Sequence, residues 1–131
     1  MATFTNAATL SYNGNTLVSN TVTGTLQELL TVSKTAVGDT YAPNGEAVFA
    51  VSLVNSGAAA LTGLTLNDNL GAYAYNTSTL YPLTYIDGSI QYYINGVLQA
   101  APTATAGPPL VISGINVPAG GNALLVYKAK V

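Results

Sequence analysis

The chain has 131 residues, of which 49% are hydrophobic and only 6% are charged, and its net charge is −2. This length fits one domain, and the hydrophobic content argues against a disordered chain, which combines low hydrophobicity with high net charge. Three lysines without any arginine argue against nucleic-acid binding, which needs clustered positive charge. Histidine and cysteine are absent, so the chain lacks the commonest general base, the commonest metal ligand and any disulfide.

The surface of such a chain has to be covered by Thr, Ser, Asn, Gly and Ala rather than by charges. Little like-charge repulsion then keeps copies apart, which suits a protein that assembles with itself. No apolar run reaches the roughly 18 residues of a membrane-spanning segment, so no membrane span is expected. The first residues, MATFTN, lack the features of a secretory signal peptide. We therefore expect either export without a signal peptide or a signal that has already been removed.

The predicted elements of the first half are β-strands, because runs of Thr, Val, Ile, Leu and Tyr are broken at short intervals by turn residues. Asn13-Gly14 favours positive φ at both turn positions and predicts a hairpin made of residues 3–12 and 16–24. A further strand is expected over residues 26–35, although its start could also form a helical turn. Residues 46–55 alternate as in a strand with one buried face.

The second half continues the β pattern. Asp87-Gly88 and Asn95-Gly96 predict two more hairpin turns. Residues 101–109 contain three prolines and are expected as a loop, since proline cannot donate the hydrogen bond that a central strand needs. The other strands predicted here are residues 61–70, 81–86, 89–94, 97–100, 110–117 and 122–131.

Many short strands with frequent turns predict an all-β fold, an immunoglobulin-like antiparallel β-sandwich of seven or more strands. We divide the chain into an N-terminal strand or hairpin extension, residues 1–24, and a sandwich domain, residues 25–131. The expected core residues are Phe49, Val51, Leu53, Leu64, Leu66 and Val126.

Three segments in a fixed order carry a family resemblance. They are LTVSKTA at residues 30–36, GEAVFAVSLVNSG at 45–57 and LTGLTLNDNL at 61–70. Together they resemble the repeat domain of bacterial surface proteins known as domain of unknown function eleven, and the resemblance covers nearly all of residues 4–131. It implies a place on a bacterial surface.

The N-terminal segment, residues 4–15, resembles the end of such a repeat, yet here it comes first. The chain therefore looks like one repeat cut in a shifted register. Either this segment folds back and completes its own domain, or it completes a neighbour through an open sheet edge. The second contact is head-to-tail and makes a filament. The candidate self-assembly residues alternate along one strand; they are Phe4, Ala8, Leu10 and Tyr12.

No group of side chains indicates catalysis. The carboxylates do not form a close pair, and without histidine no base is available to activate a serine or threonine. We therefore predict that the chain is not an enzyme, needs no cofactor, and carries its carboxylates as solvated turn residues. These carboxylates are Glu28, Asp39, Glu46, Asp68 and Asp87.

The sequence contains partial patterns for two further chemistries. Asn67-Asp68-Asn69 offers oxygen ligands for calcium, but such side chains more often hold turns, so no metal site is predicted. An internal Lys–Asn isopeptide bond would need Lys34 and Glu46 together with either Asn6 or Asn20. The chain has no Asp-x-Asp-x-Asp-Gly loop and its final strand carries no Asn after Asn122, so neither is predicted.

Six tyrosines fall in one third of the chain, where aromatic rings could stack on sugars or form an interface. Tyr92 and Tyr93 must point to opposite faces of a strand, so at most one is in the core. The expected function is a structural subunit of an extracellular bacterial fibre or appendage, on a cell or spore surface, whose partners are identical subunits. The alternative is a monomeric adhesion or carbohydrate-binding module for host or surface glycans. The six are Tyr73, Tyr75, Tyr81, Tyr85, Tyr92 and Tyr93.

Overall fold

The computed structural model describes residues 2–131, which form fifteen β-strands and no helix, so none that could cross a membrane. In the first half of the chain the strands are β1 (Thr3–Asn6), β2 (Thr9–Tyr12), β3 (Asn15–Val18), β4 (Val22–Thr25), β5 (Leu30–Ala36), β6 (Glu46–Asn55) and β7 (Leu61–Asp68). The second half forms β8 (Tyr73–Tyr75), β9 (Ser78–Leu80), β10 (Thr84–Tyr85), β11 (Gln91–Ile94), β12 (Val97–Gln99), β13 (Thr103–Thr105), β14 (Leu110–Val117) and β15 (Asn122–Lys130).

Two antiparallel sheets form a sandwich. The larger sheet has the strand order β12-β11-β15-β6-β5, and the short β10 also pairs with β15. The smaller sheet has the order β13-β14-β7. The all-β antiparallel sandwich predicted from the sequence is therefore confirmed. Its two sheets are unequal, with five strands on the main path of one and three in the other.

The hydrophobic core lies between these sheets. Val51 and Leu53 are buried in it as predicted, and Phe49, Leu64 and Leu66 are partly buried against it. The prediction for Val126 is wrong. On β15 the buried side chains are the alternate residues on the other face, and Val126 lies between two of them. The run LLVY is apolar on both faces, so alternation could not decide which face is buried. The buried residues of β15 are Ala123, Leu125, Tyr127 and Ala129.

The prediction of a hairpin around Asp87-Gly88 is also wrong. β10 and β11 do not pair with each other, because both pair with β15. The turn between them bonds back to the same strand: the Ile86 N–H donates to the Lys128 carbonyl, and the Lys128 N–H donates to Ser89 Oγ, both at 3.0 Å. The long edge of β15 thus satisfies the backbone groups of both segments.

Three smaller differences concern strand boundaries. The predicted loop 101–109 contains the short strand β13, which tolerates flanking prolines because it lies at the edge of its sheet. The hairpin β8–β9, which turns at Asn76 with φ 54°, was not predicted. Residues 26–29 form neither strand nor helix, and β5 begins only at Leu30. The Asn95-Gly96 hairpin of β11 and β12 is confirmed.

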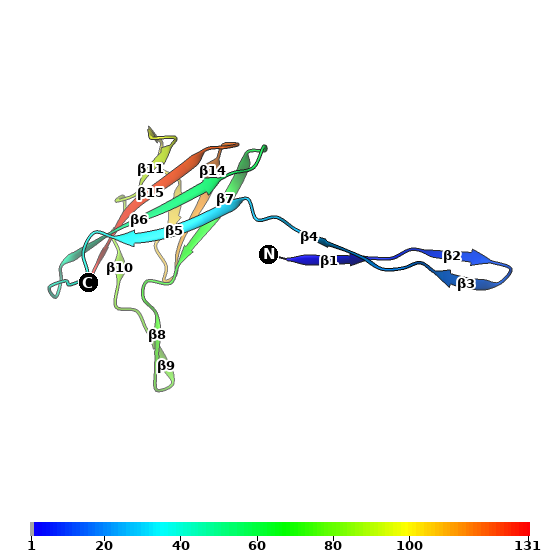
Figure 1. Cartoon of the computed structure of the whole chain (residues 1–131). Helices are drawn as coiled ribbons and strands as arrows, with labels where there is room; N and C mark the ends of the chain where they lie inside the picture. Colours follow the sequence, from blue (N-terminus) through cyan, green and yellow to red (C-terminus); the bar gives the residue numbers. More distant parts are fainter. Residues whose placement is uncertain (1) are drawn as a thin grey trace.

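Residues 2–25 form an arm that projects away from the sandwich (Figure 1). β1 pairs with β4 near the sandwich, and β2 pairs with β3 at the far end, where Asn13 and Gly14 make the turn with φ 47° and 75°. The predicted hairpin is thus confirmed, although each of its strands is divided in two. Within the described residues the arm strands pair only with one another. Met1, the first residue of the predicted extension, lies outside the described residues.

Candidate functional site

The outer half of the arm, the hairpin β2–β3, has two unlike faces. Leu10 pairs with Leu17 and Tyr12 with Asn15, so these residues share a face. The side chains of Leu10, Tyr12 and Leu17 are 63%, 64% and 53% exposed. The other face carries Thr9, Ser11, Thr16 and Val18. We call Leu10, Tyr12 and Leu17 the apolar face of the arm.

The inner half of the arm, β1–β4, is more polar. Phe4 pairs with Gly24 and Asn6 with Val22, which places all four on one face. A Cβ atom at position 24 would lie only 2.3 Å from the Phe4 ring, so the ring lies across the glycine. The opposite face consists of threonines alone, namely Thr3, Thr5, Thr23 and Thr25. Residues 2–25 contain no charged side chain.

The candidate self-assembly residues from the sequence all lie on this arm, in three places. Leu10 and Tyr12 belong to the apolar face, whereas Phe4 lies over Gly24 in the inner half. Ala8 lies in the break before β2, where its N–H donates to Ser19 Oγ at 2.9 Å. Leu17 was missed. The two-residue turn at Asn13-Gly14 fixes the register and could have placed Leu17 opposite Leu10.

A slot opens on the sandwich between β5 and β7, the last strands of their sheets. Val32 on β5 pairs with the buried Leu53, so its side chain points inward, yet it is 57% exposed. The smaller sheet ends at β7 and leaves this part of β5 uncovered. We call this opening the β5–β7 slot. Its lining residues are Val32, Lys34, Val51, Leu66, Asn67, Asp68, Asn69 and Tyr127.

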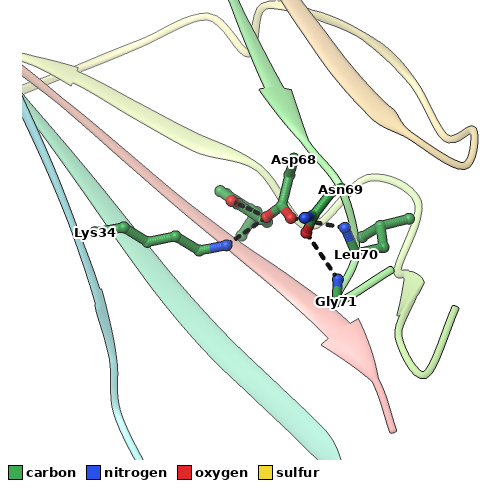
Figure 2. Close-up of polar contacts among 6 residues, drawn as sticks. Lys34, Asp68, Asn69, Leu70 and Gly71 are labelled. Atoms are coloured by element: carbon green, nitrogen blue, oxygen red, sulfur yellow. Dashed lines mark hydrogen bonds and ion pairs between the residues drawn. The ribbon is translucent and has the colours of Figure 1, made fainter. Parts of the chain in front are cut away.

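An ion pair lies in the slot. Lys34 Nζ is 2.6 Å from Asp68 Oδ2, and the Tyr127 hydroxyl donates to the same oxygen at 2.5 Å. The Leu70 N–H donates to Asp68 Oδ1 at 2.9 Å. Figure 2 shows Lys34 and Asp68 pointing toward each other from their two strands. Lys34 Nζ also lies 4.4 Å from the centre of the Phe49 ring, within cation–π range.

These contacts set the charge states of the cluster. Burial acts to raise the pKa of Asp68, but hydrogen bonds from Lys34, Tyr127 and the Leu70 N–H, with the charge of Lys34, outweigh it and lower that pKa. Burial, followed by the hydrogen bond and charge of Asp68, raises the pKa of Tyr127 well above the ordinary tyrosine value. At neutral pH the carboxylate is therefore charged and the phenol is neutral.

The structure corrects the prediction that Asp68 is a solvated turn residue, because this side chain is buried and paired. Its oxygens already accept internal hydrogen bonds, and Asn69 Oδ1 accepts one from the Gly71 N–H at 3.0 Å, as in a turn (Figure 2). Over residues 2–131, no three His, Cys, Asp or Glu side chains are grouped so that they could hold a metal.

The residues considered for an isopeptide bond do not come together. Lys34 bonds Asp68 in the sandwich, whereas Asn6 and Asn20 lie on the arm. Glu46 instead lies 3.5 Å from Lys128. The three components of the hypothesis therefore have other neighbours.

The six tyrosines do not form one surface. Tyr85 and Tyr92 are buried in the core, and Tyr93 is only partly buried, so one of the adjacent pair is core as predicted. The others are exposed, two of them on the hairpin β8–β9 that projects from the sandwich (Figure 1). These exposed tyrosines are Tyr73, Tyr75 and Tyr81.

No family model, curated protein or solved structure matches the chain. Its function must therefore be inferred from the arm and the sandwich themselves.

Proposed function

We propose that this chain is a structural, non-enzymatic subunit of a self-assembling extracellular bacterial fibre or appendage, and that its arm joins identical subunits head-to-tail by β-strand complementation. The observation that carries the proposal is the apolar face of the arm, which is exposed in the free chain. A two-stranded ribbon is only marginally stable in water without a second layer. Such a ribbon gains stability when a partner covers its apolar face.

The magnitudes favour strand addition over contact between two flat patches. Fully burying one large apolar side chain contributes roughly 1.5–3 kcal/mol, so three contribute several kcal/mol at most. Association costs roughly 4–15 kcal/mol in lost freedom of motion. Side-chain burial alone therefore does not give a stable joint. Backbone hydrogen bonds along an unpaired strand edge supply a further contribution and also fix the direction of the contact.

The geometry of such a joint leads to an open polymer. The arm and the surface that receives it are different parts of the chain, so the contact is head-to-tail and leaves one of each free at the ends. Because the chain carries few charges, like-charge repulsion between packed subunits is weak. The resemblance to repeats of bacterial surface proteins supports a place on a cell or spore surface. It also supports an immunoglobulin-like form of the sandwich.

Electron microscopy and size measurement test the proposal. Purified full-length protein is expected to form filaments in negative stain and to elute as large species. Deleting residues 2–25 should give a monomer whose circular dichroism spectrum is still that of a folded strand protein. Full-length protein that stays monomeric at high concentration, or filaments that persist after the deletion, would refute the fibre proposal.

The second candidate function is a monomeric adhesion or carbohydrate-binding module. The observation in its favour is the pair of exposed rings on β8, Tyr73 and Tyr75, since aromatic rings can stack on sugars. Binding of the arm-deleted monomer to a glycan array, lost in a Tyr73→Ala/Tyr75→Ala variant, would support it. Equal binding by that variant would exclude these rings as the sugar site.

A further inference from the structure

We infer that the β5–β7 slot is the acceptor for the arm of a second copy, and that the hairpin β2–β3 is the part that enters it. This inference rests on the proposed fibre function and names the second surface of its joint. The hairpin lies beside β7, extends the smaller sheet, and places its apolar face over the inner side of β5.

The first support is the incomplete second layer of the sandwich. Five strands of the larger sheet face only three of the smaller one. Val32 and Leu53 are direct neighbours across β5 and β6, but Leu53 is buried while Val32 is mostly exposed. β7 is the last strand of its sheet, so one of its backbone edges is unpaired. An added strand at this position would pair with β7 and cover Val32 at once.

The second support is the match in charge and polarity. Among the residues that line the slot, Lys34 and Asp68 are the charged ones, and they neutralise each other at 2.6 Å. The other lining residues are uncharged: Val32, Val51 and Leu66 are apolar, and Asn67, Asn69 and Tyr127 complete the lining. An uncharged occupant with one apolar face fits this lining, and the β2–β3 hairpin is such a segment.

The third support is the length of the two elements. β2 and β3 have four residues each and β7 has eight, so one hairpin strand fits along the unpaired edge of β7. Leu10 and Leu17 lie directly opposite each other on these two strands, so both fall within the short stretch that the hairpin would cover. Either strand of the hairpin is thus shorter than the edge of β7 that it would occupy.

The position of the arm identifies the occupant as a second copy. The arm leaves the sandwich at the start of β5 and extends away from it, with β2–β3 at the far end (Figure 1). The apolar face is therefore remote from the slot of its own chain and available to that of another. Each subunit then offers one arm and one slot.

A pair of matched substitutions tests the slot. Val32→Lys places a charge in the slot at a position already exposed in the subunit, so folding should be retained. Val54→Lys is the control, because Val54 is exposed on the same sheet but lies on its outer face, 45% exposed. We expect Val32→Lys to raise the concentration needed for half-assembly at least about tenfold. Val54→Lys should assemble as the unchanged protein does.

Mixing two blocked subunits tests the pairing directly. A Leu10→Ser/Leu17→Ser variant has a defective arm and an intact slot, while Val32→Lys has an intact arm and a defective slot. Each alone should be monomeric, and their mixture should form one-to-one dimers in light scattering, because the joint cannot continue. Assembly of Val32→Lys at unchanged concentration, or a mixture that stays monomeric, would overturn the inference about the slot.

Covalent cross-linking gives a test that does not depend on the effect of the Val32→Lys substitution. The chain has no cysteine, so Val32→Cys and Leu17→Cys proteins can be mixed and oxidised. The inference predicts a covalent dimer that is absent when Val54→Cys replaces Val32→Cys, and equal yields with both would contradict it. Filaments of the unchanged protein without this cross-link would leave the fibre function standing and reject the slot. Unchanged protein that never assembles would reject the fibre function itself.

Discussion

Tyr127 of the sandwich and Tyr12 of the arm both lie on paired antiparallel strands, yet only 1% of the first side chain is exposed and 64% of the second. The difference is a second layer. β15 is covered by the smaller sheet, and no element of the described chain covers β2. Strand pairing satisfies the backbone in both regions, but only the sandwich removes its apolar side chains from water. In this chain, whose regular elements are all strands, coverage and not pairing therefore separates the buried core from the exposed arm.

The largest expected effect comes from the same substitution made in each region. Leu125→Ala in the core should lower the free energy of unfolding by roughly 2–5 kcal/mol, because it leaves a cavity at a fully buried site. Leu10→Ala should leave the unfolding of the arm-bearing monomer nearly unchanged and weaken assembly instead. Urea denaturation under conditions where both variants are monomeric measures the first quantity, and light scattering measures the second. A large loss of monomer stability in Leu10→Ala would show that the arm is covered by its own domain.

A smaller effect is expected from the ion pair, where the slot meets the core. Lys34→Met leaves the buried Asp68 carboxylate without its cation, but Tyr127 and the Leu70 N–H still donate to it. Because the Lys34 side chain is 41% exposed and screened by water, we expect a loss of about 1–2 kcal/mol. The double variant Lys34→Met/Asp68→Leu should recover part of this loss, as replacing a whole ion pair often does. Equal stabilities in urea for the single variant and the unchanged chain would show that the pair contributes nothing.

The smallest expected effect is the dependence of stability on pH. Asp68 has a lowered pKa in the folded chain, so its stabilising contribution is present above the ordinary aspartate pKa of about 3.9 and is lost as the pH falls toward the folded value. Tyr127 has a raised pKa, so its contribution is present below about pH 10 and is lost as the pH rises further. Thermal unfolding followed between about pH 2 and pH 7, the acid range in which carboxylates titrate, should show a flatter acid limb in Asp68→Asn. An unaltered acid limb in that variant would assign the acid loss to other carboxylates.

The features that were predicted correctly depend on neighbours in sequence. Asn13-Gly14 specifies both a turn and the pairing on either side of it, because positive φ at two adjacent positions allows few alternatives. Asp87-Gly88 carries the same local signal, but the nearby strands pair with β15 instead. The turn residue thus predicts a change of direction and leaves the pairing partner to competition among distant strands.

The features that were missed depend on residues far apart in the chain. Asp68 is buried because Lys34 and Tyr127, 34 and 59 residues away, meet it across the sandwich. The β5–β7 slot exists because two sheets of different width are stacked, which no local pattern encodes. The apolar face of the arm could be predicted from the sequence, because one turn fixes its register. The slot that we propose accepts it could not be predicted, because it forms only when the two sheets pack together.

The attachment of the arm to the start of β5 also has a mechanical consequence. When a chain of such subunits is stretched, tension enters each sandwich at Leu30, where the arm joins β5. β5 is held along one edge by β6 over seven residue pairs. A pull along the strand shears these pairs together, whereas a pull across it would open them one after another. Within each subunit, β5 would therefore resist brief tension until its pairs with β6 shear together.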